Sequence, residues 1–337
     1  MSELRAATLG YAVLAATAAA YLAVYTTSLG HLPTPFDYLS LLNTSLPLVF
    51  VAIGQSLVVL TGGIDLSVGG MVGLGVAIVA AGSTGSAAVT AGWMLAAVAA
   101  GAACGAVNGV VVARGRIAPI LTTLATLSVY SGLALKVLPV PGGEISPAVR
   151  SVLTDPDLPT GLIWLGAAVA GWLVLRRTRF GMRVYAVGSD EAAARASGVP
   201  TVRVKVGVYS LSGLCSGLAA VFYVSTTTSG DPNAGDPFIL TSIAAVVVGG
   251  IAFAGGRGSA LGAVAGAFAL TLVIDVLFFA GIDPLYQSLF QGLFLVVAVL
   301  LGSLLRWRRS GSPPRLRRSG GLLRLRRSGG PLRWRRS

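Results

Sequence analysis

Apolar stretches bounded by glycine, proline and charged residues recur along the chain and predict ten membrane-spanning helices. A helix that crosses the hydrocarbon core of a bilayer needs about 20 apolar residues. The expected segments are 8–29, 41–60, 64–82, 87–113, 117–138, 160–175, 205–225, 238–253, 259–280 and 285–305. The third and the eighth are short and rich in glycine, which is typical of broken or re-entrant segments. The pattern therefore predicts an all-α polytopic membrane protein with about ten transmembrane helices, some of them short or broken.

The positions of the basic residues predict how these helices are oriented. Lysine and arginine accumulate in cytoplasmic loops of membrane proteins. If the N-terminus is cytoplasmic, all of the 25 lysines and arginines except Lys136 and Arg150 fall on the inner side, and most acidic residues fall in outer loops. We therefore expect a multi-pass protein of a bacterial plasma (inner) membrane, with both the N- and C-termini in the cytoplasm.

Two predicted connections are long enough to have a role beyond linking helices. The outer loop 139–159 is rich in proline and acidic residues, which suits a docking rim or a short interfacial helix. The inner loop 176–204 carries local helix signals, namely a cap at Ser189 or Asp190, helix-favouring residues at 191–196, and a stop at Gly198 and Pro200. These signals predict a short cytoplasmic helix, and a solvated connector is the alternative.

The composition separates a membrane domain from a basic tail. The chain is 54% hydrophobic and 11% charged, with a formal charge of +13. Residues 306–337 contain 12 arginines and no acidic residue, and Arg-Arg-Ser recurs in them with a nine-residue period. Such a segment cannot pack a core, so we expect a disordered cytoplasmic tail or one lying on anionic lipid, and no nucleic-acid partner. Residues 1–305 form the transmembrane domain.

Catalytic, metal and nucleotide sites are not expected in this chain. Lysine occurs only at Lys136 and Lys205, and neither ends the glycine-rich loop that cradles phosphates in ATPases. The two cysteines and the single histidine lack metal-ligand spacing. We therefore expect no bound cofactor, no metal and no enzymatic activity.

Polar residues at membrane depth are the candidates for a translocation path. Asp275 lies near the middle of the ninth expected span, and charges placed there are functional candidates because their burial is costly. Asp65 follows a glycine pair and precedes Leu66-Ser67, so a helix cap and a transport role are both open. The neutral candidates are Gln55, Asn108, Thr122, Thr123 and Thr126. Each can bind a hydroxyl-rich solute or hold neighbouring helices together.

Four stretches carry a resemblance to a known family. They are LTGGIDLSVGGMVGL (60–74), AVNGVVVARGRIAPILTTLATLSVYSGLAL (106–135), TRFGMRVYAVGSDEAAARASGVPTVRVKVGVYSLSGLCSGLAAV (178–221) and SIAAVVVGGIAFAGGRGSALGAVAGAF (242–268). Together they closely resemble the membrane permease subunits of ABC-type importers for simple sugars, the ribose/xylose/galactoside group. The likeness runs from about residue 40 to 305 in the same order.

The resemblance implies a set of partners and a mechanism. It implies a second permease subunit in a homo- or heterodimer, a cytoplasmic ABC ATPase that uses ATP and Mg, and an extracytoplasmic sugar-binding protein that delivers a monosaccharide-like solute. In this family the long cytoplasmic loop carries a helix that seats in a groove of the ATPase. The matching residues here are Gly188, Glu191, Ala192, Ala193, Ser197 and Gly198.

Other solutes and another mechanism stay open at this point. The same architecture can import a nucleoside, a sugar-derived signal or a branched-chain amino acid. Relatives often place asparagines in the ninth span, where this chain has Ile274-Asp275-Val276. A less favoured hypothesis is a carrier or channel that works without an ATPase and uses Asp275.

Overall fold

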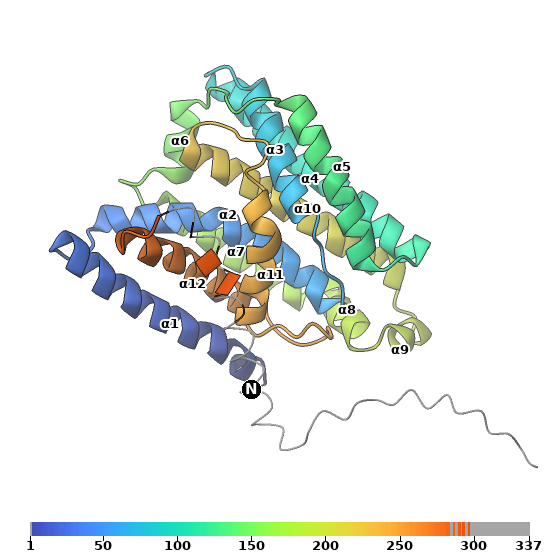
Figure 1. Ribbon diagram of the computed structural model, residues 1–337. Coiled ribbons are helices and arrows are strands. Elements are labelled where there is room, and N and C mark those ends of the chain that lie inside the picture. Colours follow the sequence, from blue (N-terminus) through green and yellow to red (C-terminus); the bar gives the residue numbers. More distant parts are fainter. Residues whose placement is uncertain (1, 284–285, 287–288, 291, 294–295, 297–337) are drawn as a thin grey trace, which may run out of the picture.

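The computed structural model describes residues 2–283, 286, 289–290, 292–293 and 296 (Figure 1). The tenth expected span, 285–305, falls mostly outside the described residues, and the tail 306–337 falls wholly outside them. The helices are α1 (Ser2–Leu29), α2 (Pro35–Leu60), α3 (Val68–Gly82), α4 (Ala87–Gly115), α5 (Pro119–Val137), α6 (Pro147–Thr154), α7 (Thr160–Arg177), α8 (Arg179–Ser189), α9 (Glu191–Ala196), α10 (Thr201–Thr227), α11 (Asp236–Val248) and α12 (Ala260–Phe279).

The all-α polytopic architecture is confirmed. Among the described residues, six helices are long and apolar enough to cross a membrane: α1 (from Gly10), α2, α4, α5, α10 and α12. α3 and α11 are shorter apolar helices, as expected for the third and eighth segments. The full count of ten spans is not established by these residues.

Close contacts between helix backbones build the centre of the bundle, where α10 packs against α2, α3 and α4. A Cβ atom added at Gly101 or Gly105 of α4 would overlap the α10 backbone at Gly213 or Tyr209. Small residues at helix interfaces let backbones approach closely in membranes, where no hydrophobic effect drives helices together. The many glycines of this sequence therefore serve helix packing.

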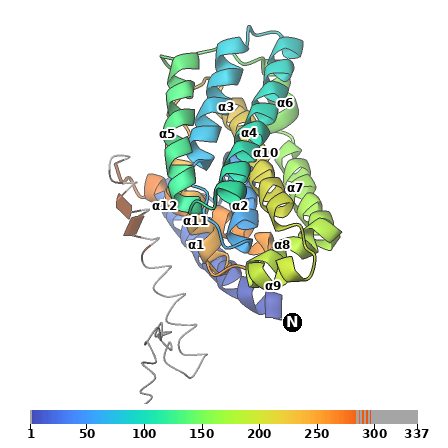
Figure 2. The same ribbon diagram turned by 90° about the vertical axis from the view of Figure 1, so that its right-hand side faces the viewer.

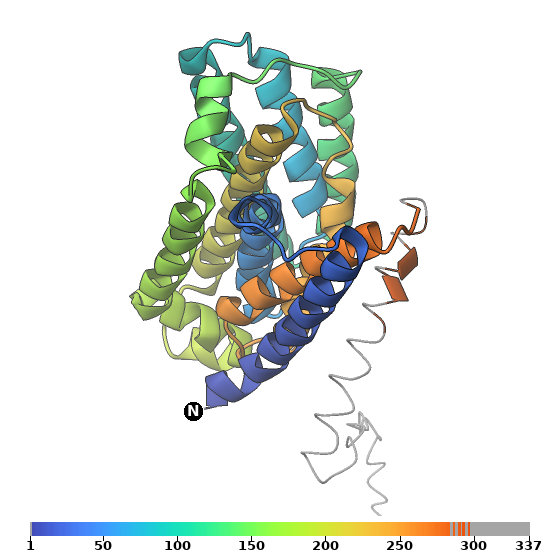
Figure 3. The same cartoon turned by 90° about the vertical axis from the view of Figure 1, so that its left-hand side faces the viewer.

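The bundle has two distinct ends. Figure 2 shows α8, α9 and the start of α1 at one end, and α6 at the opposite end. Figure 3 shows α1 lying along α12 at the side of the bundle. The segment expected to be cytoplasmic and the N-terminal helix start thus share one end, and the loop expected to be outside lies at the other.

Five helix boundaries differ from the expected ones by four residues or more. α1 begins at Ser2 instead of 8 and α10 at Thr201 instead of 205, and the other three differ for local reasons. α2 begins at Pro35 instead of 41, because Thr34 and Asp37 form a capping box around its first turn. α3 begins at Val68 instead of 64, because residues 61–67 form a turn. α11 ends at Val248 instead of 253, because Gly250 adopts a left-handed conformation with φ of 82°.

The two long connections contain helices where the sequence predicted them, and one more. α6 lies within 139–159, and α9 covers the six residues predicted at 191–196. The helix α8 was not predicted. Its N-cap is Thr178, whose hydroxyl accepts a hydrogen bond from the backbone N–H of Gly181 at 3.1 Å.

Candidate coupling segment and translocation path

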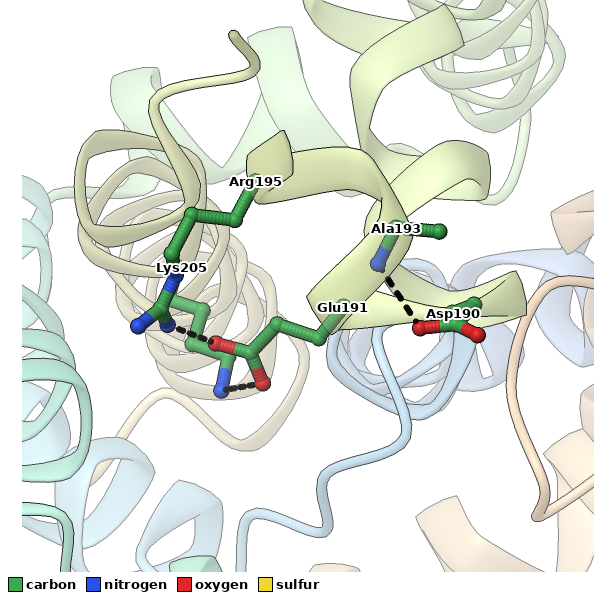
Figure 4. Close-up of polar contacts among 5 residues, drawn as sticks. All are labelled: Asp190, Glu191, Ala193, Arg195 and Lys205. Carbon is green, nitrogen blue, oxygen red and sulfur yellow. Dashed lines mark hydrogen bonds and ion pairs between the residues drawn. The ribbon is translucent and has the colours of Figure 1, made fainter. Parts of the chain in front are cut away.

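Helix α9 has a well-defined start and stop. The Asp190 carboxylate accepts a hydrogen bond from the backbone N–H of Ala193 at 3.0 Å, which caps the first turn (Figure 4). After Ser197, Gly198 ends the helix with φ of 81°, a conformation that favours glycine. Of the six residues matched to the ATPase-binding helix, Glu191, Ala192 and Ala193 lie in α9, Ser197 and Gly198 follow its end, and Gly188 lies in the preceding helix α8.

Glu191 is the electrostatic centre of this helix. Its two carboxylate oxygens pair with Lys205 Nζ of α10 at 2.6 Å and with an Arg195 guanidinium nitrogen at 3.0 Å (Figure 4). Partial burial pushes the pKa of the Glu191 carboxyl upward, but the hydrogen bond and charge of Lys205, helped by Arg195, outweigh it. The net pKa lies below its ordinary value. Glu191 thus anchors α9 to α10 as a carboxylate.

A basic groove of about 1050 Å³ runs between α9 and the connection from α4 to α5. Arg114 and Arg116 line it on one side, and Ala192 and Arg195 line it on the other. Arg116 has a φ of 54°, which is uncommon for a residue other than glycine. With Lys205 and Glu191, which also line it, the groove gathers four basic side chains and one carboxylate at the predicted coupling helix.

The end of α8 lies against two partly buried turns of the bundle. We call residues 60–67, which begin with the last residue of α2, the first turn, and residues 249–259 the second turn. Gly188 lies so close to both that a Cβ atom there would overlap the Leu60 carbonyl oxygen and lie 2.6 Å from Gly256 N. The Gly256 N–H also donates a hydrogen bond to the Leu60 carbonyl oxygen at 2.9 Å. A movement of α8 must therefore either displace both turns or separate Gly188 from Leu60 and Gly256.

A second link joins α8 to the same region. The Tyr185 hydroxyl donates a hydrogen bond to the carbonyl oxygen of Gly258 at 2.8 Å. A Cβ atom at Gly256 would also lie within 2.8 Å of the Ser189 backbone. The second turn is thus held against α8 by backbone contact and by a side-chain hydrogen bond.

A network of buried polar groups holds the first turn. One oxygen of the Asp65 carboxylate accepts hydrogen bonds from the Ser67 N–H (3.0 Å) and hydroxyl (2.6 Å). The other oxygen accepts from the Ser212 hydroxyl of α10 at 3.2 Å. The Asp65 side chain is fully buried. Bonding to an N–H two residues ahead is how an aspartate stabilises a turn, so Asp65 organises the start of α3 without being its N-cap residue.

The network continues across α4 and α5. The Asn108 amide donates to the Ser67 hydroxyl at 2.7 Å, and the Tyr130 hydroxyl donates to the Asn108 amide oxygen at 3.1 Å. Thr123 accepts from the Leu66 N–H at 3.1 Å. When every polar side chain of a buried network has a hydrogen-bond partner, the network favours a single arrangement of those side chains. This one ties the first turn to three helices.

Gln55 completes the support from α2. With its amide oriented to satisfy both groups, its nitrogen donates to the Asp65 carbonyl oxygen at 3.1 Å and its oxygen accepts from the Asp65 N–H at 3.3 Å. Gln55 is fully buried. Its contacts are with the backbone of the first turn.

The structure brings four path candidates together and separates three. Gln55, Asp65, Asn108 and Thr123 meet in the sealed network around the first turn. Thr126 donates to the Thr122 carbonyl oxygen of its own helix, and the Thr122 hydroxyl is buried without a hydrogen-bond partner. Asp275 lies on α12 and lines a different cavity. Tyr130 is a network member that the sequence did not single out, because a tyrosine in an apolar helix carries no distinctive signal.

The side chains that commonly bind metals are dispersed in the part of the chain that the structure describes. No group of three or more histidine, cysteine, aspartate or glutamate side chains there is placed to hold a metal ion. Cys104 and Cys215 are free thiols. The polar groups described above act through hydrogen bonds.

Comparison with known families decides what kind of protein carries this architecture. The family described as "branched-chain amino acid transport system / permease component" matches residues 38–299. The chain belongs to this permease family. It is therefore a multi-pass membrane transport component and not an enzyme.

Similar permeases cover most of the chain. The ribose import permease protein RbsC of Escherichia coli (strain K12) is 36% identical over 266 residues, which cover 74% of this chain and 80% of that protein. RbsC of Bacillus subtilis (strain 168) is 35% identical over 293 residues, covering 79% and 84%. The fructose import permease protein FrcC of Rhizobium meliloti is 34% identical over 271 residues, covering 76% and 74%. No solved structure matches the permease.

Proposed function

We propose that this permease is the transmembrane subunit of an ATP-driven ABC importer that translocates a monosaccharide-like solute delivered by an extracytoplasmic binding protein. The relatives are named for ribose, fructose and galactose import, which favours a simple sugar over a nucleoside, a sugar-derived signal or a branched-chain amino acid. The observation that carries the proposal is the capped helix α9 at one end of the bundle, linked through α8 to both turns.

We assign each partner to one face of the permease. α8, α9 and the N-terminus are cytoplasmic, where the ABC ATPase binds ATP and Mg and seats α9 in a groove. The coupling residues are Gly188, Glu191, Ala192, Ala193, Ser197 and Gly198. A second permease subunit completes the transmembrane unit, and the loops 139–159 and 226–237 meet the binding protein outside.

Movement would pass from the ATPase to the helices through backbone contacts. When the ATPase subunits close, they displace α9 and with it α8. Because Gly188 contacts Leu60 and Gly256 directly, the displacement reaches the first and second turns. These turns begin α3 and end α11, the two short helices, so tilting them alternates access to the solute path. The network around Asp65 keeps the first turn rigid enough to transmit the movement.

An ATPase-independent carrier that uses Asp275 is the competing function. In such a carrier α9 would bind no ATPase, and its ion pairs with α10 would only hold the connection between α8 and α10 in place. Three features favour the ATP-driven importer: the capped helix α9, the basic groove beside it and the contact of α8 with both turns.

The test is co-purification of the permease with the ABC ATPase subunit proposed as its partner. Glu191→Lys replaces a carboxylate that pairs with Lys205 and Arg195 by a third cation, so α9 should detach from α10 and ATPase recovery should fall at least tenfold. Glu144→Lys makes the same charge change on an exposed residue at the opposite end of the bundle and serves as the control. Full ATPase recovery with Glu191→Lys would reject the assignment of α9.

A further inference from the structure

A cavity of about 510 Å³ lies within a single subunit, between α2, α10, α11 and α12. Asp275 and Thr271 of α12 line it, together with Thr44 of α2 and Asp231 of the connection from α10 to α11. Its volume falls in the range of small-molecule sites. None of the residues of the sealed Asp65 network lines it, so it is a separate feature of the fold.

The threonines of this cavity present only hydrogen-bond acceptors to its interior. Each of the five donates its proton to a backbone carbonyl oxygen: Thr44 to Leu41 (3.0 Å), Thr226 to Tyr223 (2.8 Å), Thr227 to Ser229 (2.8 Å), Thr241 to Pro237 (2.7 Å) and Thr271 to Ala267 (3.2 Å). A hydroxyl has one proton and two lone pairs. Once the proton is engaged in the helix, the lone pairs remain for a ligand.

The carboxylates add to the same acceptor surface. No described lysine or arginine forms an ion pair with Asp275, although it lies in a transmembrane helix. Asp231 uses one oxygen to accept the Asn233 N–H at 2.8 Å. A carboxylate at membrane depth without a basic partner is a functional candidate. Apart from the Asn233 amide and the Tyr223 hydroxyl, which can donate, the polar side chains of the lining present acceptors, so a ligand that fits this cavity must supply mainly hydrogen-bond donors.

An aromatic pair forms another part of the lining. The rings of Tyr223 on α10 and Phe238 on α11 meet edge to face, with centroids 6.3 Å apart and an angle of 85° between their planes. Aromatic faces and edges offer apolar contact of defined shape. A hard cation would use oxygen ligands alone. A molecule with hydroxyls and an apolar C–H face would use both parts of the lining.

We propose that this cavity is a solute-binding site within one permease subunit, and that it takes a small neutral molecule with several hydroxyls, of the monosaccharide class. The inference rests on the proposed function and names where its solute binds. Asp275 accepts hydrogen bonds from the solute's hydroxyls, Thr271 and Thr44 accept further ones, and Tyr223 with Phe238 covers the C–H face.

The experiment measures equilibrium binding of radiolabelled D-ribose, D-galactose and D-fructose to the permease–ATPase complex in nanodiscs, without binding protein or ATP. Asp275→Asn should weaken binding of the recognised sugar about tenfold or more, and Thr271→Val about threefold to tenfold. Thr17→Val is the matched control, because Thr17 is equally buried and also donates to the carbonyl four residues earlier, but on α1 outside the cavity. ATPase recovery should be equal for all four proteins.

Each outcome decides the inference separately from the proposed function. Wild-type affinity in both Asp275→Asn and Thr271→Val would overturn the site. So would a wild-type complex that imports a sugar yet binds none of the three. Binding of ²²Na⁺ that Asp275→Asn removes, with no sugar binding, would overturn it in favour of a cation site. Failure of the wild-type complex to import any sugar with ATP would instead reject the proposed function.

Discussion

Replacing Gly188 by alanine perturbs the contact through which α8 reaches both turns. The added Cβ atom would overlap the Leu60 carbonyl oxygen and lie 2.6 Å from Gly256 N. Both neighbours are backbone atoms, so no side chain can rotate away. Overpacking of this kind costs about 1–3 kcal/mol. Separating Leu60 from Gly256 also loses their 2.9 Å hydrogen bond, which contributes about 1 kcal/mol.

The expected result has a stability part and a coupling part. The melting temperature of the purified permease should fall by about 2–4 °C for each kcal/mol lost. The substitution should move α8 away from the first and second turns, so less of the ATPase movement should reach them. The ATPase should still bind, but more ATP should be hydrolysed for each sugar imported. Scanning fluorimetry measures the first effect, and paired ATPase and uptake assays in proteoliposomes measure the second.

Gly166→Ala supplies the control for this prediction. Gly166 lies in α7, and a Cβ atom there meets nothing within 4 Å. Alanine in an open helix position is about 0.5–1 kcal/mol more favourable than glycine, so this variant should be as stable as the wild type or more so. If Gly188→Ala is as stable and as well coupled as Gly166→Ala, the role given to this contact is refuted.

Three further predictions concern other parts of the chain. Asp65→Asn should lower the unfolding free energy by about 1–3 kcal/mol in thermal denaturation, because an amide nitrogen cannot accept from Ser67 or Ser212. Glu191→Gln should melt below the wild type at every pH above 4.5, the ordinary pKa of the group, and the difference should shrink as the pH falls through the lowered pKa of Glu191. Removing residues 306–337 should leave sugar uptake near normal.

Controls make these three predictions decisive. Asp157→Asn changes an exposed carboxylate in the outer loop and should leave the melting temperature unchanged. If Asp65→Asn also leaves the melting temperature unchanged, the role given to the hydrogen-bond network is contradicted. For Glu191, a difference that grows on acidification would contradict the ion pair. A large loss of uptake after removal of 306–337 would show a function of the arginine repeat.

Much of the fold follows from local sequence signals. Apolar stretches bounded by glycine, proline and charge located the described helices that match expected spans to within six residues at each end, and the cap at Asp190 with the stop at Gly198 located α9. The start of α2 was missed by six residues because the Thr34–Asp37 capping box is polar and hides the helix start from a search for apolar residues. Helix α8 was missed because its charged residues, including Arg179 and Arg183, resemble a solvated loop.

The sites depend on contacts between distant residues, which no local signal reveals. Asp65 and Asp275 were both path candidates in the sequence, with a helix cap also open for Asp65. In the structure Asp65 is buried among hydrogen bonds, and Asp275 lines a cavity. Gly188 was assigned to the ATPase-binding helix through the family resemblance. Its contact with Leu60 and Gly256 became visible only when three segments far apart in the chain were placed side by side.

The central claim is that this permease moves a sugar only when an ATPase drives it through α9. The most direct measurement is uptake of radiolabelled D-ribose, D-galactose and D-fructose into liposomes containing the permease, with the ATPase, ATP and the binding protein each omitted in turn. We expect uptake of at least one sugar in the complete system and none when any component is missing. Sugar uptake by the permease alone would contradict it.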